Sequence, residues 1–262
     1  MRIDYLTEAL YLRLKPYKNA RSLLDFLKKD QQVNSFLDAT NAATIQRLGY
    51  NDHGITHSHI TTFNAVKSLQ ILNEKGVAPN LVKECKYAKF EDSLEVVIAA
   101  AYLHDIGNSV MRGQHELFST ILSREIINRY YSKPTDLNER KKSTIMEGII
   151  CHMGNPNWPP ATLEAKLIPI ADACDMEQGR ARVPYSLGKK DIHSLSALAI
   201  TKVRLKDGEK KPLRIYIEME HSAGIFQVEE LLIKKIKAAN FQEYVEIEAN
   251  ITSRNEKITY LD

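Results

Sequence analysis

Six of the eight histidines in this 262-residue chain lie between His53 and His152. A neutral imidazole is the side chain that most often binds a transition-metal ion, so this clustering indicates a metal site. At its centre, His104 and Asp105 directly follow the apolar segment EVVIAAAYL. Burying two ionisable side chains at the end of an apolar helix is costly unless a partner satisfies both. A metal ion does so, because it accepts imidazole nitrogen and carboxylate oxygen together.

Further candidate ligands lie on other predicted helices. His57 is near the start of one helix, His115 begins another, and His152 ends a third. A fourth helix carries an aspartate near its end, within the sequence PIADACD. Six nitrogen and oxygen ligands spread over a helical bundle are enough for two metal ions with positions left open for water. In chain order the set is His57, His104, Asp105, His115, His152 and Asp172.

The order H…HD…D resembles the hallmark of the HD-domain metal-dependent phosphohydrolase superfamily, over roughly residues 45–180. The sequences AAYLHDIG and IPIADACD are similar to its local signatures. The segments DMEQGRARVPY and HSAGIFQVEELL resemble uncharacterised archaeal-type members, which gives a fold expectation and no substrate. The resemblance implies an all-helical fold, a divalent metal and the hydrolysis of phosphate mono- or diesters.

The resemblance also assigns the metal ligands. It places the first ion on His57, His104, Asp105 and Asp172. It places the second on His115 and His152, with Asp105 bridging the two ions. Because such nitrogen and oxygen ligands suit several metals alike, we expect one or two ions of Mn, Fe, Mg, Co or Zn.

The sequence HGITH holds a second pair of interest, His53 and His57. The two lie four residues apart, and so on one face if the segment is helical. Cyclic-nucleotide phosphodiesterases of the superfamily carry a similar pair, in which the second histidine binds metal and the first protonates the leaving oxygen. By this resemblance His53 is the candidate general acid, and it forms the catalytic set with Asp105. His59 is two residues further on, so we expect it to point away from that face.

The chain departs from the family pattern just after HDIG. Many members have a lysine there, whereas this chain has Asn108, so a cationic phosphate contact is missing. Three arginines are candidates to replace it, because a guanidinium group binds phosphate through two hydrogen bonds at once. They are Arg112, Arg180 and Arg182. The GYP signature of cyclic-di-GMP phosphodiesterases is also absent, which argues against that subclass.

Residues 1–185 read as one helical domain. Apolar residues recur there at spacings of three and four, which is typical of helices with one buried face. The segment before His104 is apolar almost all round, so it predicts a central buried helix. Other helices are expected over residues 34–48, 114–131, 137–153 and 163–175, and over a segment that ends at Gly76.

The pattern changes in residues 186–262, which predict a small α+β unit. Asp207-Gly208 is a turn signal between a β-branched segment and an alternating one, so a hairpin is expected. An amphipathic helix over residues 228–239 and an alternating strand over 244–251 complete a ββαβ order. The fold class is therefore mainly α, an HD-type helical bundle with a C-terminal unit that serves dimerisation or regulation.

Composition excludes several classes of protein. A net charge of +3 is too small for a nucleic-acid-binding footprint. No run approaches 18 apolar residues, so a membrane span is not expected. The N-terminus lacks the apolar core of a signal peptide. Three cysteines without a CxxC pair read as reduced thiols, which favours the cytoplasm.

The sequence thus predicts a metal-dependent phosphohydrolase that uses a metal-activated water on a small phosphorylated substrate, with a nucleotide preferred. A di-iron oxygenase is an alternative, because the same six ligands suit an iron pair. A nucleotide-sensing module that retains the site is another, because small α+β units often hold ligands or pair between chains. We also expect a homo-oligomer.

Overall fold

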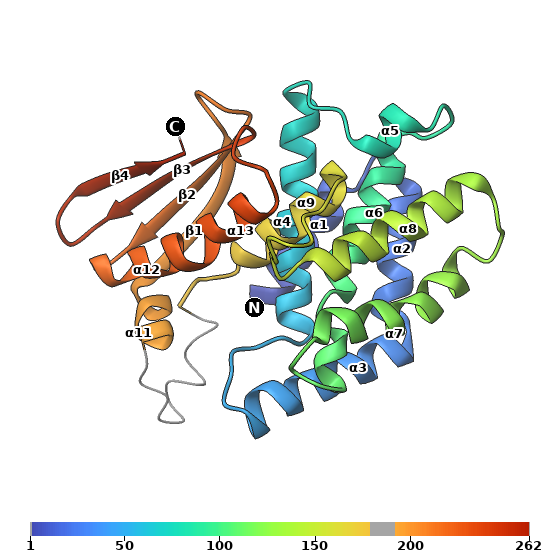
Figure 1. Ribbon diagram of the computed structural model, residues 1–262, viewed down its shortest axis with the longest axis horizontal. Helices are drawn as coiled ribbons and strands as arrows, with labels where there is room; N and C mark the ends of the chain where they lie inside the picture. Colours follow the sequence, from blue (N-terminus) through green and yellow to red (C-terminus); the bar gives the residue numbers. More distant parts are fainter. Residues whose placement is uncertain (1, 179–191, 262) are drawn as a thin grey trace.

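The computed structural model describes residues 2–178 and 192–261 (Figure 1). A bundle of helices is followed by a small sheet with short helices on one face, as Figure 1 shows. The predicted fold class, mainly α with a small C-terminal α+β unit, is confirmed. The predicted domain boundary at residue 185 lies outside the described residues. None of the described helices has the length and apolar character needed to cross a membrane.

Helix α6 (Phe90–Leu103) is the centre of the bundle. It contacts α2, α4, α8 and α9, and it is buried from Ser93 to its end. It is the predicted central helix, buried because its sequence is apolar on every face. The helices of the bundle are α1 (Arg2–Arg13), α2 (Lys18–Lys29), α3 (Gln31–Asn41), α4 (Ile55–Glu74), α5 (Asn80–Glu84), α6, α7 (His115–Tyr130), α8 (Asp136–Cys151) and α9 (Leu163–Ala173).

Two short elements modify this bundle. A π-helical segment, η1 (Ala42–Arg47), continues α3, so the helix expected over residues 34–48 is a composite of two kinds of turn. A 3-10 turn, η2 (Ile106–Ser109), directly follows the HD pair and contacts α3 and α7. The chain therefore turns sharply where the two central candidate ligands lie.

The C-terminal unit is a four-stranded sheet in the order β1-β2-β3-β4. The β1–β2 and β3–β4 pairs are antiparallel and the β2–β3 pair is parallel. The predicted ββαβ order is incomplete, because β4 forms a fifth element at the edge of the sheet. Its residues are mostly exposed, so they lack the strong apolar alternation that marks the other strands. The strands are β1 (Ile200–Asp207), β2 (Leu213–Met219), β3 (Val245–Ile251) and β4 (Glu256–Tyr260).

Short helices cover one face of this sheet. The predicted amphipathic helix is divided between a π-helical segment and α13, which contacts α9 of the bundle. In Figure 1, α13 lies between the sheet and the bundle. The C-terminal unit is thereby placed against the helix that carries Asp172. The elements are α11 (Ile192–Ala199), η3 (Ser222–Gly224), α12 (Ile225–Gln227), η4 (Val228–Ile233) and α13 (Lys234–Ala238).

The turn between β1 and β2 is held by the buried carboxylate of Glu246 on β3. This carboxylate accepts hydrogen bonds from the backbone N–H groups of Glu209, Lys210 and Lys211. The Arg214 guanidinium also donates to it, at 2.6 Å. Burial opposes ionisation, but these four donors outweigh it and lower the pKa of Glu246 to about 2.

We expect Glu246→Ala to lower the free energy of unfolding by ~1–3 kcal/mol, because the turn donors lose their acceptor. A carboxyl whose folded-state pKa is depressed contributes stability above its unfolded value and loses it as the pH falls. The contribution of Glu246 should therefore disappear between about pH 4.5 and pH 2. Urea unfolding across this window measures both effects, with the exposed Glu256→Ala as the matched control. A variant as stable as the control at pH 7 would contradict this role.

Candidate metal centre

Helix ends supply the candidate ligands. The first turn of α4 and the first residue of α7 each contribute a histidine, and α6 and α8 each end at one. An aspartate follows α6, and another lies in the last turn of α9. All six predicted ligands are buried, and the structure brings them into one cluster. These residues are His57, His104, Asp105, His115, His152 and Asp172.

A glycine sets the distance between the HD pair and α7. A Cβ atom on Gly107 would lie 2.1 Å from the backbone oxygen of His115 and 2.3 Å from the backbone nitrogen of Ser119. The Gly107 N–H instead donates to the Ser119 hydroxyl at 2.8 Å. Only the absence of a side chain lets the first turns of α7 approach this closely. The glycine of HDIG therefore positions His115 beside Asp105.

Each of the four candidate histidine ligands uses its Nδ1 atom as a hydrogen-bond donor. Three donate to backbone carbonyl groups one turn earlier, and the fourth donates to a carboxylate. A neutral imidazole that donates from Nδ1 carries a lone pair on Nε2, where it can bind a metal ion. The acceptors are Ala101 O for His104, Arg112 O for His115, Ile149 O for His152 and Asp175 Oδ2 for His57, at 2.7–3.0 Å.

The first group of facing donors contains His57 and His104, whose Nε2 atoms lie 3.1 Å apart. Asp172 Oδ1 is 3.1 Å from Nε2 of His57, and Asp105 Oδ2 is 3.3–3.4 Å from both Nε2 atoms. Two lone pairs and two carboxylate oxygens thus face one another in a buried space. Such a donor set repels itself unless a cation lies among its atoms, so the residues fit a metal ion.

The second group contains His115 and His152, whose Nε2 atoms are also 3.1 Å apart. Asp105 Oδ1 lies 3.1 Å from the first and 3.6 Å from the second. The two oxygens of Asp105 therefore face different histidine pairs. This arrangement suits a carboxylate shared between two ions, although the ligand roles themselves stay a prediction.

The cluster also shifts the pKa values of its carboxyl groups. Burial alone would raise the pKa of Asp105, but the imidazoles of His104 and His53 hold it well below its ordinary value. Burial likewise opposes ionisation of Asp172, and the Lys235 ammonium, followed by His57, holds its pKa well below the usual range. Positive charge among these atoms, whether a proton on an imidazole or a metal ion, thus favours the carboxylate form of both groups, which is the form that binds a metal ion.

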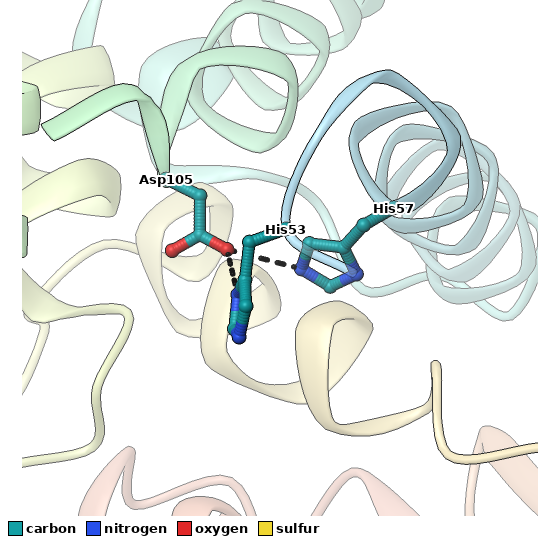
Figure 2. Close-up of side chains that lie close together, drawn as sticks. All are labelled: His53, His57 and Asp105. Carbon is teal, nitrogen blue, oxygen red and sulfur yellow. Dashed lines mark hydrogen bonds and ion pairs between the residues drawn. The ribbon is translucent and has the colours of Figure 1, made fainter. Parts of the chain in front are cut away.

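His53 lies in the loop before α4, because that helix begins at Ile55. Its Nδ1 atom is 2.6 Å from Asp105 Oδ2, the oxygen that His57 also faces, as Figure 2 shows. His53 and His57 therefore do not share a helix face, yet both point at one carboxylate. His59 points away as expected, since its ring nitrogens lie beside the hydroxyl groups of Thr7 and Tyr102.

The predicted phosphate-binding arginines are only partly described. Arg112 lines the pocket at the candidate metal centre, donates to Asn108 Oδ1 at 2.9 Å and lies over the ring of Tyr50. The Asn108 amide in turn donates to Asp105 Oδ1 at 3.0 Å. Asn108, which replaces the lysine of many family members, therefore binds the carboxylate of Asp105 through a hydrogen bond. Arg180 and Arg182 lie outside the described residues.

This pocket holds ≈ 340 Å³, and its walls come from both parts of the chain. The C-terminal unit contributes Ala197, Gln227, Leu231 and Lys235. Sequence reasoning missed Lys235, because no local pattern links α13 to a metal site more than 60 residues earlier in the chain. It also missed the orienting role of Asp175, for which its spacing of three residues from Asp172 was the available signal.

Comparison with known proteins identifies the family. A model of the HD domain matches residues 55–177. The uncharacterized protein MJ1020 of Methanocaldococcus jannaschii is 41% identical over 233 residues, which cover 88% of this chain and 89% of that protein. The chain belongs to the HD domain family. No solved structure gives a significant match.

Membership in the HD domain family confirms the resemblance seen in the order of the residues. It places the chain in a superfamily of metal-dependent phosphohydrolases, and the buried His/Asp cluster is where a metal ion can bind. All six candidate ligands lie within the matched segment. His53 lies two residues before this segment, and Lys235 lies well beyond it.

Proposed function

We propose that this HD domain protein hydrolyses a small phosphate ester, with a nucleotide as the preferred substrate, by using two divalent ions. One observation carries the proposal. The Nε2 atoms of His57 and His104 face one oxygen of Asp105, and those of His115 and His152 face the other. Bound ions would lower the pKa of a water molecule toward neutrality and polarise the phosphoryl oxygens. The same arrangement of shared carboxylate and histidine pairs supports a centre of two ions over a centre of one.

The protein's own groups have distinct roles in this proposal. Asp105 lies between the two histidine pairs with one oxygen facing each, and Asp175 fixes the ring of His57 through its Nδ1 atom. His53 lines the pocket and protonates the departing ester oxygen as general acid. The bond to the leaving group breaks as water adds to phosphorus, so the products are a phosphate group and an alcohol.

The pocket supports a small substrate. Its volume is near the lower end of the range for ligand pockets, which suits a molecule of nucleotide size better than a polymer. Arg112 and Tyr50 line one wall of the pocket, where the guanidinium group lies over the ring and can donate hydrogen bonds to a phosphate group. The free state of all three cysteines supports the proposed cytoplasmic location.

The decisive experiment joins elemental analysis of the purified protein to a hydrolysis screen. Nucleoside monophosphates, cyclic nucleotides and dinucleotides are tested after chelation, with Mn, Fe, Mg, Co or Zn added back. Two ions per chain and metal-dependent release of phosphate or a nucleotide support the proposal. Tightly bound iron with O₂ consumption would instead indicate an oxygenase, and nucleotide binding without turnover would indicate a sensing module.

Single-histidine variants test the number of ions. We expect His115→Asn to lose one of two bound ions, because His115 faces only the Oδ1 side of Asp105. The complementary His57→Asn should lose the other ion. Elemental analysis and isothermal titration measure both, with the exposed His221→Asn as control. Loss of both ions, or of neither, in His115→Asn would contradict the assignment to two groups.

A further inference from the structure

Lys235 brings a cation from the C-terminal unit into the pocket of the HD domain. It is the second residue of α13, and its ammonium group lies 2.5 Å from Asp172 Oδ2. The other oxygen of this carboxylate, Oδ1, faces His57 in the first group of donors. Lys235 therefore lies directly beside the centre without occupying the position of a metal ligand.

The stem of Lys235 is held by the loop that follows His152. Gly154 has a φ of 71°, a backbone conformation that favours glycine. A Cβ atom there would lie 3.0 Å from Cγ and 3.4 Å from Cα of Lys235. The loop thus leaves room for this lysine at a position where another side chain would press against it. The neighbouring Lys234 differs, because its side chain is 63% exposed and pairs with Glu230 on the surface.

The charge of the pocket shows what Lys235 can bind. Among the described residues that line the pocket, the lysine and arginine side chains are Lys235 and Arg112. Lys235 lies beside the first group of donors, which contains His57. Arg112 lies in the loop before α7, where its backbone oxygen accepts a hydrogen bond from His115. An ammonium group has three donors, and Asp172 accepts one of them. With divalent ions bound, positive charge in the pocket exceeds the charge of its carboxylates, so an anionic oxygen is the complementary partner.

We propose that Lys235 binds the phosphate group of the substrate, so that the C-terminal unit completes the active site of the HD domain. This inference rests on the proposed function. It assigns to α13 a substrate-binding role and to the C-terminal unit a part in catalysis beyond dimerisation or regulation.

The test compares Lys235→Met and Lys235→Arg with Lys234→Met, the matched surface control. Binding of inorganic phosphate to the metal-loaded proteins is measured by isothermal titration, alongside metal content, KM and kcat. We expect Lys235→Met to weaken phosphate binding and raise KM by about 10- to 100-fold, the size of one charge-assisted hydrogen bond. Metal content should be unchanged, Lys235→Arg should recover part of the affinity, and Lys234→Met should resemble the natural protein. If Lys235→Met does not fold, Lys235→Gln and Lys235→Arg provide the same comparison.

The outcomes separate this inference from the function on which it rests. Hydrolysis by the natural protein with unchanged phosphate affinity in Lys235→Met would overturn the inference alone. Loss of metal without loss of phosphate affinity would also overturn it and would make Lys235 a positioning residue for Asp172. Phosphate binding that depends on Lys235, in a protein that hydrolyses no ester, would uphold the inference and refute the proposed function.

Discussion

Replacing Asp105 with alanine is expected to remove both metal ions and to lower the rate of hydrolysis by at least ~1000-fold. The reason is geometric, since one oxygen of this carboxylate faces His57 and His104 and the other faces His115 and His152. Elemental analysis of the purified variant and turnover with each added metal measure the two effects.

Two further variants make this result specific. Asp105→Asn keeps the shape of the side chain but loses its charge, and it should bind metal far more weakly than the natural protein. The exposed His221→Asn should keep full metal content and full activity. Normal metal content together with normal turnover in Asp105→Ala would refute the proposed centre.

Replacing His53 with asparagine is expected to lower kcat by ~100- to 10,000-fold for esters with an alcohol leaving group, because general acid catalysis is lost. Esters with a nitrophenyl leaving group need little protonation, so their hydrolysis should fall by less than ~10-fold. Metal content should remain at the natural level, since Asp105 keeps its other imidazole neighbours. Steady-state kinetics with the two kinds of ester measure the difference.

The comparison between leaving groups separates a general acid from a positioning residue. If His53 only held Asp105 in place, both kinds of ester would slow by the same factor. An equal loss for the two esters, or loss of bound metal, would therefore contradict the catalytic role of His53. His59→Asn is a useful second control, because that ring faces Thr7 and Tyr102 on the other side of α4.

The residues that the structure gathers into the cluster could be named from the sequence because they lie at helix ends that the sequence marks clearly. The apolar run of α6 stops at His104, and polar residues at such a point need a partner. The order of the histidines and aspartates then identified the family. Local pattern could not show that α4 begins after His53, since the loop there depends on contacts with α3: Asn41 Oδ1 accepts from the N–H of His53.

Long-range contacts set the limit of sequence reasoning. Lys235 looks like a surface lysine in an amphipathic helix, and only the packing of α13 against α9 brings it to Asp172. Strand β4 was missed because an edge strand with exposed residues is stabilised by pairing with β3 more than by burial. The expected homo-oligomer stays a prediction.

The fixed orientation of the four candidate ligand histidines has an entropic consequence. Folding has already ordered each ring through its Nδ1 hydrogen bond, so metal binding need not immobilise these side chains again. The metal-free protein instead retains repulsion between facing lone pairs, which an ion relieves. An ion whose free concentration is 100 times its dissociation constant adds about 2.7 kcal/mol to the free energy of unfolding. In a cell short of metal the protein would therefore unfold more often and be degraded faster by proteases. The abundance of this protein would then follow the supply of metal even without any change in its synthesis.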